Sequence, residues 1–184
     1  GGSINIKDKG NNDPVTAADM SANRIITQSL KRGFPEHAIL TEEDPDTWSK
    51  TGNEWVWMID PLDGTRDFIK ANGEFVTMVG LTHFGVPFIG VVIEPATGME
   101  LYACKGLGAY KSSLSKRDAS LKVTVSDAPD PEHLRIAISR SHRDQKVDKL
   151  IELLDVKEEI SSGSVGRKMG MVINGEADIY VHPS

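Results

Sequence analysis

Two aspartates, Asp60 and Asp63, follow an apolar segment at residues 55–59 that is rich in β-formers. A proline and a glycine beside them favour a fixed φ and a sharp turn. The pattern predicts a buried strand that delivers both carboxylates, with the backbone carbonyl of Leu62 between them, into one small volume. Hard divalent cations such as Mg²⁺ prefer oxygen ligands of this kind. We therefore predict a metal site at this strand end.

Carboxylates also stand at the ends of two other apolar segments, Asp19 in one and Glu42 with Glu43 in the other. Taken singly, each has an ordinary explanation. Asp19 could complement a helix dipole, the two glutamates could belong to a solvated acidic loop, and Asp60 and Asp63 could cap or form a turn. Taken together, the clusters favour two cations about 3.5–4 Å apart that Asp60 bridges.

Two cations placed in this way would hold a phosphate ester between them. One would lower the pKa of a bound water, and the other would stabilise the leaving oxygen. A hydroxyl beside a carboxylate could take the proton of that water, and Thr65 with Asp19 is the pair that we predict. A short helix that begins at Thr65 would turn its N–H groups toward the phosphate.

The composition limits the classes of protein to consider. The chain has 184 residues, of which 39% are hydrophobic, enough for one ordinary domain or two small lobes with a core. Its net charge of −6 argues against a nucleic-acid scaffold or a binder of anionic membranes. The single cysteine, Cys104, excludes an internal disulfide and fits a reducing compartment, so we predict a cytoplasmic protein. No apolar stretch approaches the roughly 18 residues of a spanning helix, and no signal peptide is visible.

The elements that must position these residues follow from apolar periodicity. The polar segment 112–122 predicts a boundary between an α+β metal-binding lobe at residues 1–112 and a partial α/β lobe at residues 113–184. The first helix follows residues 13–16 and presents Met20, Ile25, Ile26 and Leu30 at helical spacing. Strands are predicted at 37–41, 55–60, 74–84, 86–94, 101–104, 108–110, 134–139 and 177–181, and two further helices at 144–154 and from 163–166 through 172.

With these residues in place, the chain resembles the lithium-sensitive, magnesium-dependent phosphatase superfamily that includes the inositol monophosphatases. Four segments carry the likeness in the expected order, at residues 13–19, 34–43, 57–68 and 175–180. The resemblance implies a mixed α/β fold, a layered α-β-α-β sandwich, here without the N-terminal helix and without a C-terminal segment that carries a further metal ligand. It also implies two or three Mg²⁺ ions as cofactor, inhibition by lithium, and the homodimers that the family often forms.

Within that superfamily, the chain is most similar to the 3′(2′),5′-bisphosphate nucleotidases, which remove the 3′-phosphate of 3′-phosphoadenosine 5′-phosphate. Gly-Thr-Arg-Asp-Phe at residues 64–68 is nearer the nucleotidase pattern Gly-Thr-Lys-Glu-Phe than the Gly-Thr-Thr-Asn-Phe typical of inositol monophosphatases. Residues 139–142 and 163–168 also match nucleotidase segments. The implied partner is a phosphorylated adenosine nucleotide, with a role in sulfur assimilation.

Carried over residue by residue, the resemblance implies that the Thr65–Asp19 pair activates water and that Glu43 supports the ligands or a third metal. It places His142 by the nucleoside, and Ser164 and Lys168 at a second phosphate. Taken alone, His142 would more often be a surface residue, Ser164 a helix N-cap and Lys168 a solvated helix charge. The implied metal ligands are Glu42, Asp60, the Leu62 carbonyl and Asp63, and the implied substrate contacts are Gly64, Thr65, His142, Ser164 and Lys168.

Two alternatives stay open. The first is an inositol monophosphatase-like enzyme on the same scaffold, and the discriminating residues are Arg66, His142 and Lys168. The second is a truncated, non-catalytic fragment that binds a metal or a partner protein, and the missing further carboxylate supports it. We expect the 184-residue chain by itself to be poorly active or inactive.

Overall fold

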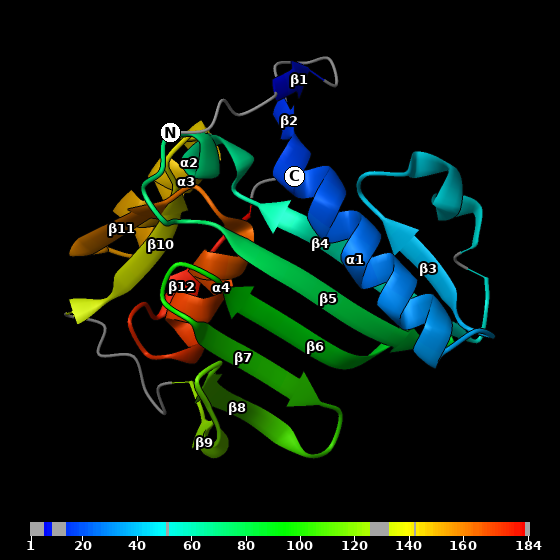
Figure 1. Ribbon diagram of the computed structural model, residues 1–184. Helices are drawn as coiled ribbons and strands as arrows, with labels where there is room; N and C mark the ends of the chain where they lie inside the picture. Colours follow the sequence, from blue (N-terminus) through cyan, green and yellow to red (C-terminus); the bar gives the residue numbers. More distant parts are fainter. Residues whose placement is uncertain (1–5, 9–13, 51, 126–132, 142, 183–184) are drawn as a thin grey trace.

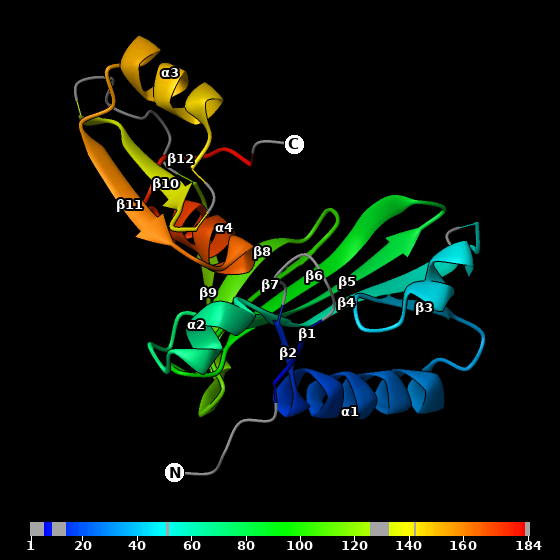
Figure 2. The ribbon, with the colours of Figure 1, turned by 90° about the horizontal axis from the view of Figure 1, so that it is seen from above.

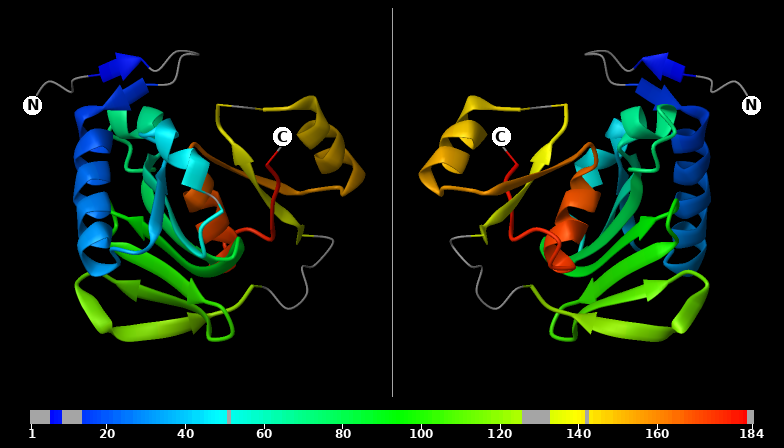
Figure 3. Two further views of the ribbon diagram at one scale, coloured as in Figure 1. Left: turned by 90° about the vertical axis from the view of Figure 1, so that its right-hand side faces the viewer. Right: turned by 90° about the vertical axis from the view of Figure 1, so that its left-hand side faces the viewer.

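Layers of helices and sheets build the molecule in the computed structural model. Helix α1 (Ala17–Gly33) covers the outer face of a large sheet, and helix α4 (Val165–Ile173) lies between this sheet and a small one (Figures 1 and 2). Helix α3 (Gln145–Leu153) covers the outer face of the small sheet, so α1 and α3 lie on opposite sides of the molecule (Figure 3). The predicted layered, mixed α/β fold is therefore confirmed. The structure describes residues 6–8, 14–50, 52–125, 133–141 and 143–182.

The large sheet has seven strands that lie side by side in the order of the sequence. Its first two strands are parallel, and every following neighbour is antiparallel. Antiparallel neighbours need only short connections, which explains why this part of the chain reads as a meander. The strands are β3 (Ala38–Thr41), β4 (Trp55–Asp63), β5 (Val76–His83), β6 (Val86–Glu94), β7 (Met99–Cys104), β8 (Gly108–Ser113) and β9 (Lys116–Val123).

Helix α1 begins with a capping box. The Thr16 hydroxyl accepts from backbone N–H groups of the first turn, and the Asp19 carboxylate accepts from the backbone N–H of Thr16. Ile26 and Leu30 then pack on the core of the large sheet, which Ile39, Trp57, Ile59 and Leu81 form. The predicted helix is confirmed, but the predicted apolar face is only half right, since Met20 and Ile25 are exposed.

The small sheet has three parallel strands, with β10 (Arg135–Ser139) between β11 (Glu158–Ser162) and β12 (Ile179–Tyr180). Such strands are buried on both faces and need helical connections. On one face, Ile136 and Ile138 pack against Val147 of α3. On the other face, α4 packs its Met171 against Ala137.

Two strands of these two sheets were not predicted from the sequence, nor were the short strands β1 (Ile6–Asp8) and β2 (Pro14–Thr16). Strand β9 lies at the edge of the large sheet and is mostly polar, and β11 is an edge strand with largely exposed residues. Edge strands bury little apolar surface, so their periodicity is weak. We predicted a lobe boundary at residue 112, yet β9 still pairs with β8. The change from one sheet to the other therefore falls between Val123 and Arg135.

Short elements complete the chain. Strand β1 (Ile6–Asp8) pairs with β2 (Pro14–Thr16), the 3-10 helix η1 (Pro45–Lys50) follows β3, and helix α2 (Thr65–Ile69) follows β4. Among the described residues, no helix has both the length and the apolar character needed to cross a membrane.

Shortening a side chain in the core of the small sheet should strongly lower the stability of the protein. Ile136 is fully buried, so Ile136→Ala should lower the free energy of unfolding by about 2–5 kcal/mol, because the cavity cannot fully collapse. Leu153→Ala is the matched control, since Leu153 is 81% exposed and its loss should change stability by less than about 0.5 kcal/mol. Urea denaturation followed by circular dichroism measures both. Equal losses in the two variants would contradict the assigned core.

Candidate functional site

The carboxyl end of β4 carries the two predicted aspartates. The pairing of β4 with β5 shifts register between Asp60 and Asp63, so the strand bulges where the carboxylates project. The backbone N–H of Leu62 donates to Asp60 Oδ1 over 3.1 Å, which ties that carboxylate to the turn. Gly64 follows with φ +95°, and a Cβ there would lie 2.9 Å from the carbonyl oxygen of Glu74. The turn therefore requires glycine both for its backbone conformation and for space.

Helix α2 begins at Thr65, as predicted, and places its hydroxyl beside Asp19. Thr65 Oγ1 lies 3.2 Å from Asp19 Oδ1 and 3.1 Å from the carbonyl oxygen of Leu62, so its one proton can go to either acceptor. Asp19 is buried, and its other oxygen accepts from the backbone N–H and the hydroxyl of Thr16. Asp19 is thus a first-turn capping residue and also the partner of Thr65. The structure brings the predicted pair together.

Three negative side chains crowd the end of β4. The backbone N–H of Glu42 donates to the carbonyl oxygen of Ile59, which sets Glu42 beside Asp60. Burial, and then the charges of Glu42 and Asp63, raise the pKa of Asp60 to about 8. A carboxyl group with so high a pKa is one that a nearby cation would stabilise as the anion. The chemistry of this donor set therefore fits a divalent cation.

The carboxylates do not form a finished metal cluster. Within the part of the chain that the structure describes, no three His, Cys, Asp or Glu side chains are gathered as a cation site. One reason is visible at Asp63, whose Oδ2 accepts from the Ser164 hydroxyl at 2.5 Å and from the backbone N–H of Gly166 at 2.7 Å. The N-terminal end of α4 thus draws Asp63 toward the small sheet, and like charges repel one another. Glu43 is half-buried next to Glu42 and does not line the cavity described below.

A cavity of about 560 Å³ opens between the end of β4 and the small sheet. The carboxylates of Glu42, Asp60 and Asp63 lie along it, and Lys168 and His182 line it as well. One enclosure therefore offers acidic groups for a cation and basic groups for an anion. The rest of its lining consists of Leu62, Gly64, Thr65, Arg66, Asp67, Ser139, Ser141, Gly163 and Val165.

Lys168 is a buried cation and not the solvated helix charge of the ordinary interpretation. Its side chain is only 1% exposed, although its residue type is almost never fully buried without a partner. Nζ donates to the carbonyl oxygen of Ser162 over 3.1 Å and lies 5.3 Å from the centre of the Tyr180 ring. Burial lowers the pKa of Lys168, and the charge of Asp63 opposes this shift. A buried lysine with so few partners is suited to bind an anion.

Ser164 is not among the residues that line the cavity, and its predicted contact with substrate stays a prediction. The residue is fully buried as the N-cap of α4, where its hydroxyl accepts from the backbone N–H of Arg167 and donates to Asp63. Val165, the next residue, lines the cavity instead. Of the ordinary interpretations, the N-cap is the one that the structure confirms. His142 lies outside the described residues.

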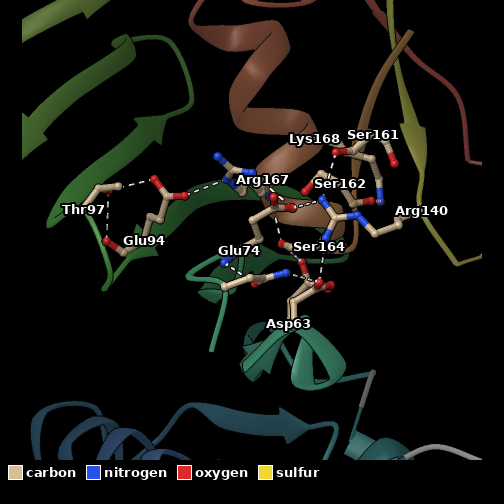
Figure 4. A network of polar contacts seen from close by, with 12 residues as sticks. Asp63, Glu74, Glu94, Thr97, Arg140, Ser161, Ser162, Ser164, Arg167 and Lys168 are labelled. Carbon is tan, nitrogen blue, oxygen red and sulfur yellow. Dashed lines mark hydrogen bonds and ion pairs between the residues drawn. The ribbon is translucent and has the colours of Figure 1, made fainter. Parts of the chain in front are cut away.

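A network of ion pairs beside the cavity was missed by the sequence analysis (Figure 4). Arg140 contacts Asp67 and Glu74, while Arg167 contacts Glu74 and Glu94. Partners in three of these pairs lie 66 or 73 residues apart in the sequence, so no local spacing could reveal them. The one sign of this network in the sequence was the number of charged residues between Gly64 and Glu74.

Comparison with known proteins identifies relatives of the whole chain. Residues 2–184 match the model of the Inositol monophosphatase family. The chain is 37% identical over 174 residues to the 3′(2′),5′-bisphosphate nucleotidase CysQ of Salmonella typhimurium. This alignment covers 94% of this chain and 67% of that protein. It is 31% identical to the crystal structure of CysQ from Bacteroides thetaiotaomicron, with a TM-score of 0.74 over 88% of this chain and 64% of that one. The resemblance noted in the sequence is confirmed.

A third match is to a solved structure that contains Mg²⁺. The crystal structure of an IMPase/NADP phosphatase complexed with Mg²⁺ and phosphate matches with a TM-score of 0.80, over 95% of this chain and 64% of that one. At 22% identity this likeness supports the fold alone, and the bound Mg²⁺ is a property of that protein. The chain spans about two thirds of the length of these relatives.

The crowding of carboxylates predicts how stability depends on pH without metal. Folding raises the pKa of Asp60 from 3.8 to about 8, so between these values the folded chain holds a proton that the unfolded chain releases. The stabilisation that this proton provides is complete below the pKa that Asp60 has in the unfolded chain. It is lost as the pH rises toward the pKa that Asp60 has in the folded chain. Because Asn does not titrate, the melting temperature of Asp60→Asn minus that of the wild type should increase over this range.

Thermal melts in EDTA across the same pH range measure this difference. Asp46→Asn serves as the control, because Asp46 is an exposed residue of η1. A difference for Asp60→Asn that stays constant with pH, or that follows the control, would show that the three carboxylates are not crowded.

Proposed function

The chain belongs to the inositol monophosphatase family, and from that membership and the geometry of its cavity we propose that the full-length protein is a metal-dependent phosphomonoesterase. Its proposed substrate is 3′-phosphoadenosine 5′-phosphate, or a related 3′(2′),5′-bisphosphate, from which it removes the 3′-phosphate. One observation carries this proposal: a single cavity contains the acidic end of β4 and, beside it, the buried ammonium group of Lys168. A substrate with two phosphates can engage both.

The acidic end of β4 would hold Mg²⁺. The residues that would bind it are Glu42, Asp60, Asp63 and the carbonyl of Leu62, and Asp63 would use Oδ1 because α4 holds its Oδ2. When bound, Mg²⁺ supplies positive charge at the phosphate oxygens and lowers the pKa of a coordinated water. The raised pKa of Asp60 supports this assignment, since such a carboxyl group needs a cation to ionise near neutral pH.

Thr65 and Asp19 would move the proton of the attacking water. The water proton passes to Thr65 Oγ1 as the hydroxyl proton passes to Asp19 Oδ1, 3.2 Å away. The water oxygen would then form the new P–O bond while the bond to the 3′-oxygen breaks, and the leaving 3′-oxygen would take a proton from solvent water to become a hydroxyl group. The two hydrogen bonds from Thr16 hold the Asp19 carboxylate in place for this transfer.

Lys168 would bind the second phosphate. An ammonium group has three N–H donors, of which the carbonyl oxygen of Ser162 takes one. Because burial lowers the pKa of Lys168, a phosphate close to Nζ would favour its charged form and gain a strong, charge-assisted contact.

The proton transfer can be tested on the full-length protein with Mg²⁺. Thr65→Ala and Asp19→Asn should each lower kcat by about 10²–10⁴-fold, the usual contribution of general acid–base catalysis, whereas Thr65→Ser keeps the hydroxyl and most of the activity. Thr27→Ala is the control, because the Thr27 hydroxyl bonds only to backbone carbonyls within α1. Phosphate release gives the rates. Wild-type kcat in Thr65→Ala would overturn the role of the hydroxyl.

Lys168 decides between the substrate classes. Lys168→Met should raise KM for 3′-phosphoadenosine 5′-phosphate by about 10–100-fold, because it loses a charged hydrogen bond to the second phosphate. The KM for adenosine 3′-monophosphate, which lacks that phosphate, should change far less. Lys149→Met, at an exposed position of α3, is the control.

Other outcomes separate the alternatives. If the wild type cleaves inositol phosphates and not the bisphosphate, the protein is an inositol monophosphatase-like enzyme. If the full-length protein neither binds Mg²⁺ nor releases phosphate from either class, the site is a non-catalytic remnant.

A further inference from the structure

Charged side chains connect the large and small sheets beside the cavity. Arg140 directly follows β10 and reaches across to the large sheet (Figure 4). Its Nη1 donates to Asp67 Oδ1 over 2.7 Å, and its Nη2 donates to Glu74 Oε2 over 2.6 Å. The same Nη2 lies 3.2 Å from the carbonyl oxygen of Ser161 on β11. One guanidinium group thus joins four segments of the chain.

The contact with Asp67 is buried and closely fitted. Asp67 is only 2% exposed and also accepts from Asn72 Nδ2 over 2.6 Å. A Cβ placed on Gly163 would lie 1.6 Å from Asp67 Oδ2, so the loop before α4 lies directly against this carboxylate. A buried charge cannot move away from its partner without a large desolvation cost. The distance between α2 and the end of the small sheet is therefore tightly determined here.

The Arg140–Asp67 pair joins the two walls of the cavity from beside it. Asp67 belongs to the same short helix as Thr65, and both residues line the cavity on the side of the large sheet. Ser139 and Ser141, on either side of Arg140, line it on the side of the small sheet. The length of this ion pair therefore sets the separation of the two walls.

We propose that Arg140 is a positioning residue that, through Asp67 and Glu74, holds the cavity at the width required by a nucleotide. The proposal rests on the proposed function for the identity of the substrate. It also joins two observations that were separate in the sequence. Residues 64–68 and 139–142 each match a nucleotidase segment, and the structure shows that Asp67 and Arg140 from these two segments form an ion pair. An asparagine at position 67, as in the inositol monophosphatase pattern, would have no charge to pair with Arg140.

The second arginine of the network strengthens the same connection. Arg167 of α4 lies 3.3 Å from Glu74 Oε2 and donates to Glu94 Oε1 over 2.7 Å. Glu74 is therefore shared by Arg140 and Arg167, and it anchors both to the segment that leads into β5. Lys168 follows Arg167 in α4, so the network also sets where the buried ammonium group lies.

The test uses the full-length protein with Mg²⁺ and two substrates of different size. In Arg140→Lys, the ammonium group cannot reach Asp67 and Glu74 together, because the two-pronged geometry is lost. We expect KM for the adenosine bisphosphate to rise about 10–100-fold, which is the size of effect that a misplacement of about 1 Å causes. The KM for p-nitrophenyl phosphate, which occupies only the acidic end of the cavity, should change less than about 3-fold. Arg143→Lys is the matched control, since Arg143 pairs with Asp148 and Glu159.

A double-variant cycle shows whether the effect passes through the ion pair. Asp67→Asn and Arg140→Gln should each raise KM for the bisphosphate, while the double variant, which restores two neutral partners, should have a lower KM than Arg140→Gln alone. If Arg140 variants do not fold, Glu74→Gln removes only the more exposed anchor and should shift KM in the same direction. Amide hydrogen exchange of residues 65–69 provides a readout without substrate, and exchange should accelerate in Arg140→Lys and not in Arg143→Lys.

The outcomes of this experiment are distinct from those of the proposed function. A wild type that does not cleave the bisphosphate refutes the proposed function, and hydrogen exchange still tests the positioning role. Equal changes of KM for both substrates, additive effects in the cycle, or unchanged exchange in Arg140→Lys would overturn the role of Arg140.

Discussion

The gathering of carboxyl groups around the partly buried Asp60 is the constraint on which the rest of this structure depends. Strand β4 carries Asp60 and Asp63 to one point, and Glu42 is brought beside them by the parallel strand β3. Burial, and then the charges of Glu42 and Asp63, raise the pKa of Asp60 to about 8. Negative charge held in so small a volume has to be compensated by positive charge or by backbone N–H groups. The surrounding structure supplies both kinds of group.

The compensating groups come from the small sheet and from α4, which explains the polar contacts between the two sheets beside the cavity. The N-terminal end of α4 binds Asp63, Arg140 binds Asp67, and Lys168 lies buried close by. Apolar contacts would hold the sheets together equally well but could not offset these charges. The same polar junction leaves a cavity in which acidic and basic groups face a common space. The need to balance charge and the ability to bind a phosphorylated ligand therefore have one structural origin.

Helix α4 occupies a central position in this arrangement because it contacts both sheets at once. Its first turn orients Asp63, its interior provides Arg167 and Lys168, and its apolar side packs Met171 on the small sheet. The two glycines of the helix permit this close packing, since a Cβ on Gly166 would lie 2.5 Å from Met78 Sδ. A change at the cavity is therefore transmitted to the packing of both sheets through one short element.

The sequence by itself determined the features that depend on neighbouring residues. The turn from Asp60 to Thr65, the start of α2 and most strands of the large sheet follow from local periodicity and from the conformational limits of proline and glycine. Only the tertiary structure decided which distant groups meet: Thr65 with Asp19 across 46 residues, Asp63 with Ser164 across 101, and Arg140 with Asp67 across 73. The resemblance of motifs anticipated the first of these contacts but not the hydrogen bond between Ser164 and Asp63, because the groups that a helix end contacts depend on how the helix packs. Packing likewise decided that Lys168 is buried and that polar segments form edge strands. A pattern of neighbouring residues cannot predict such packing.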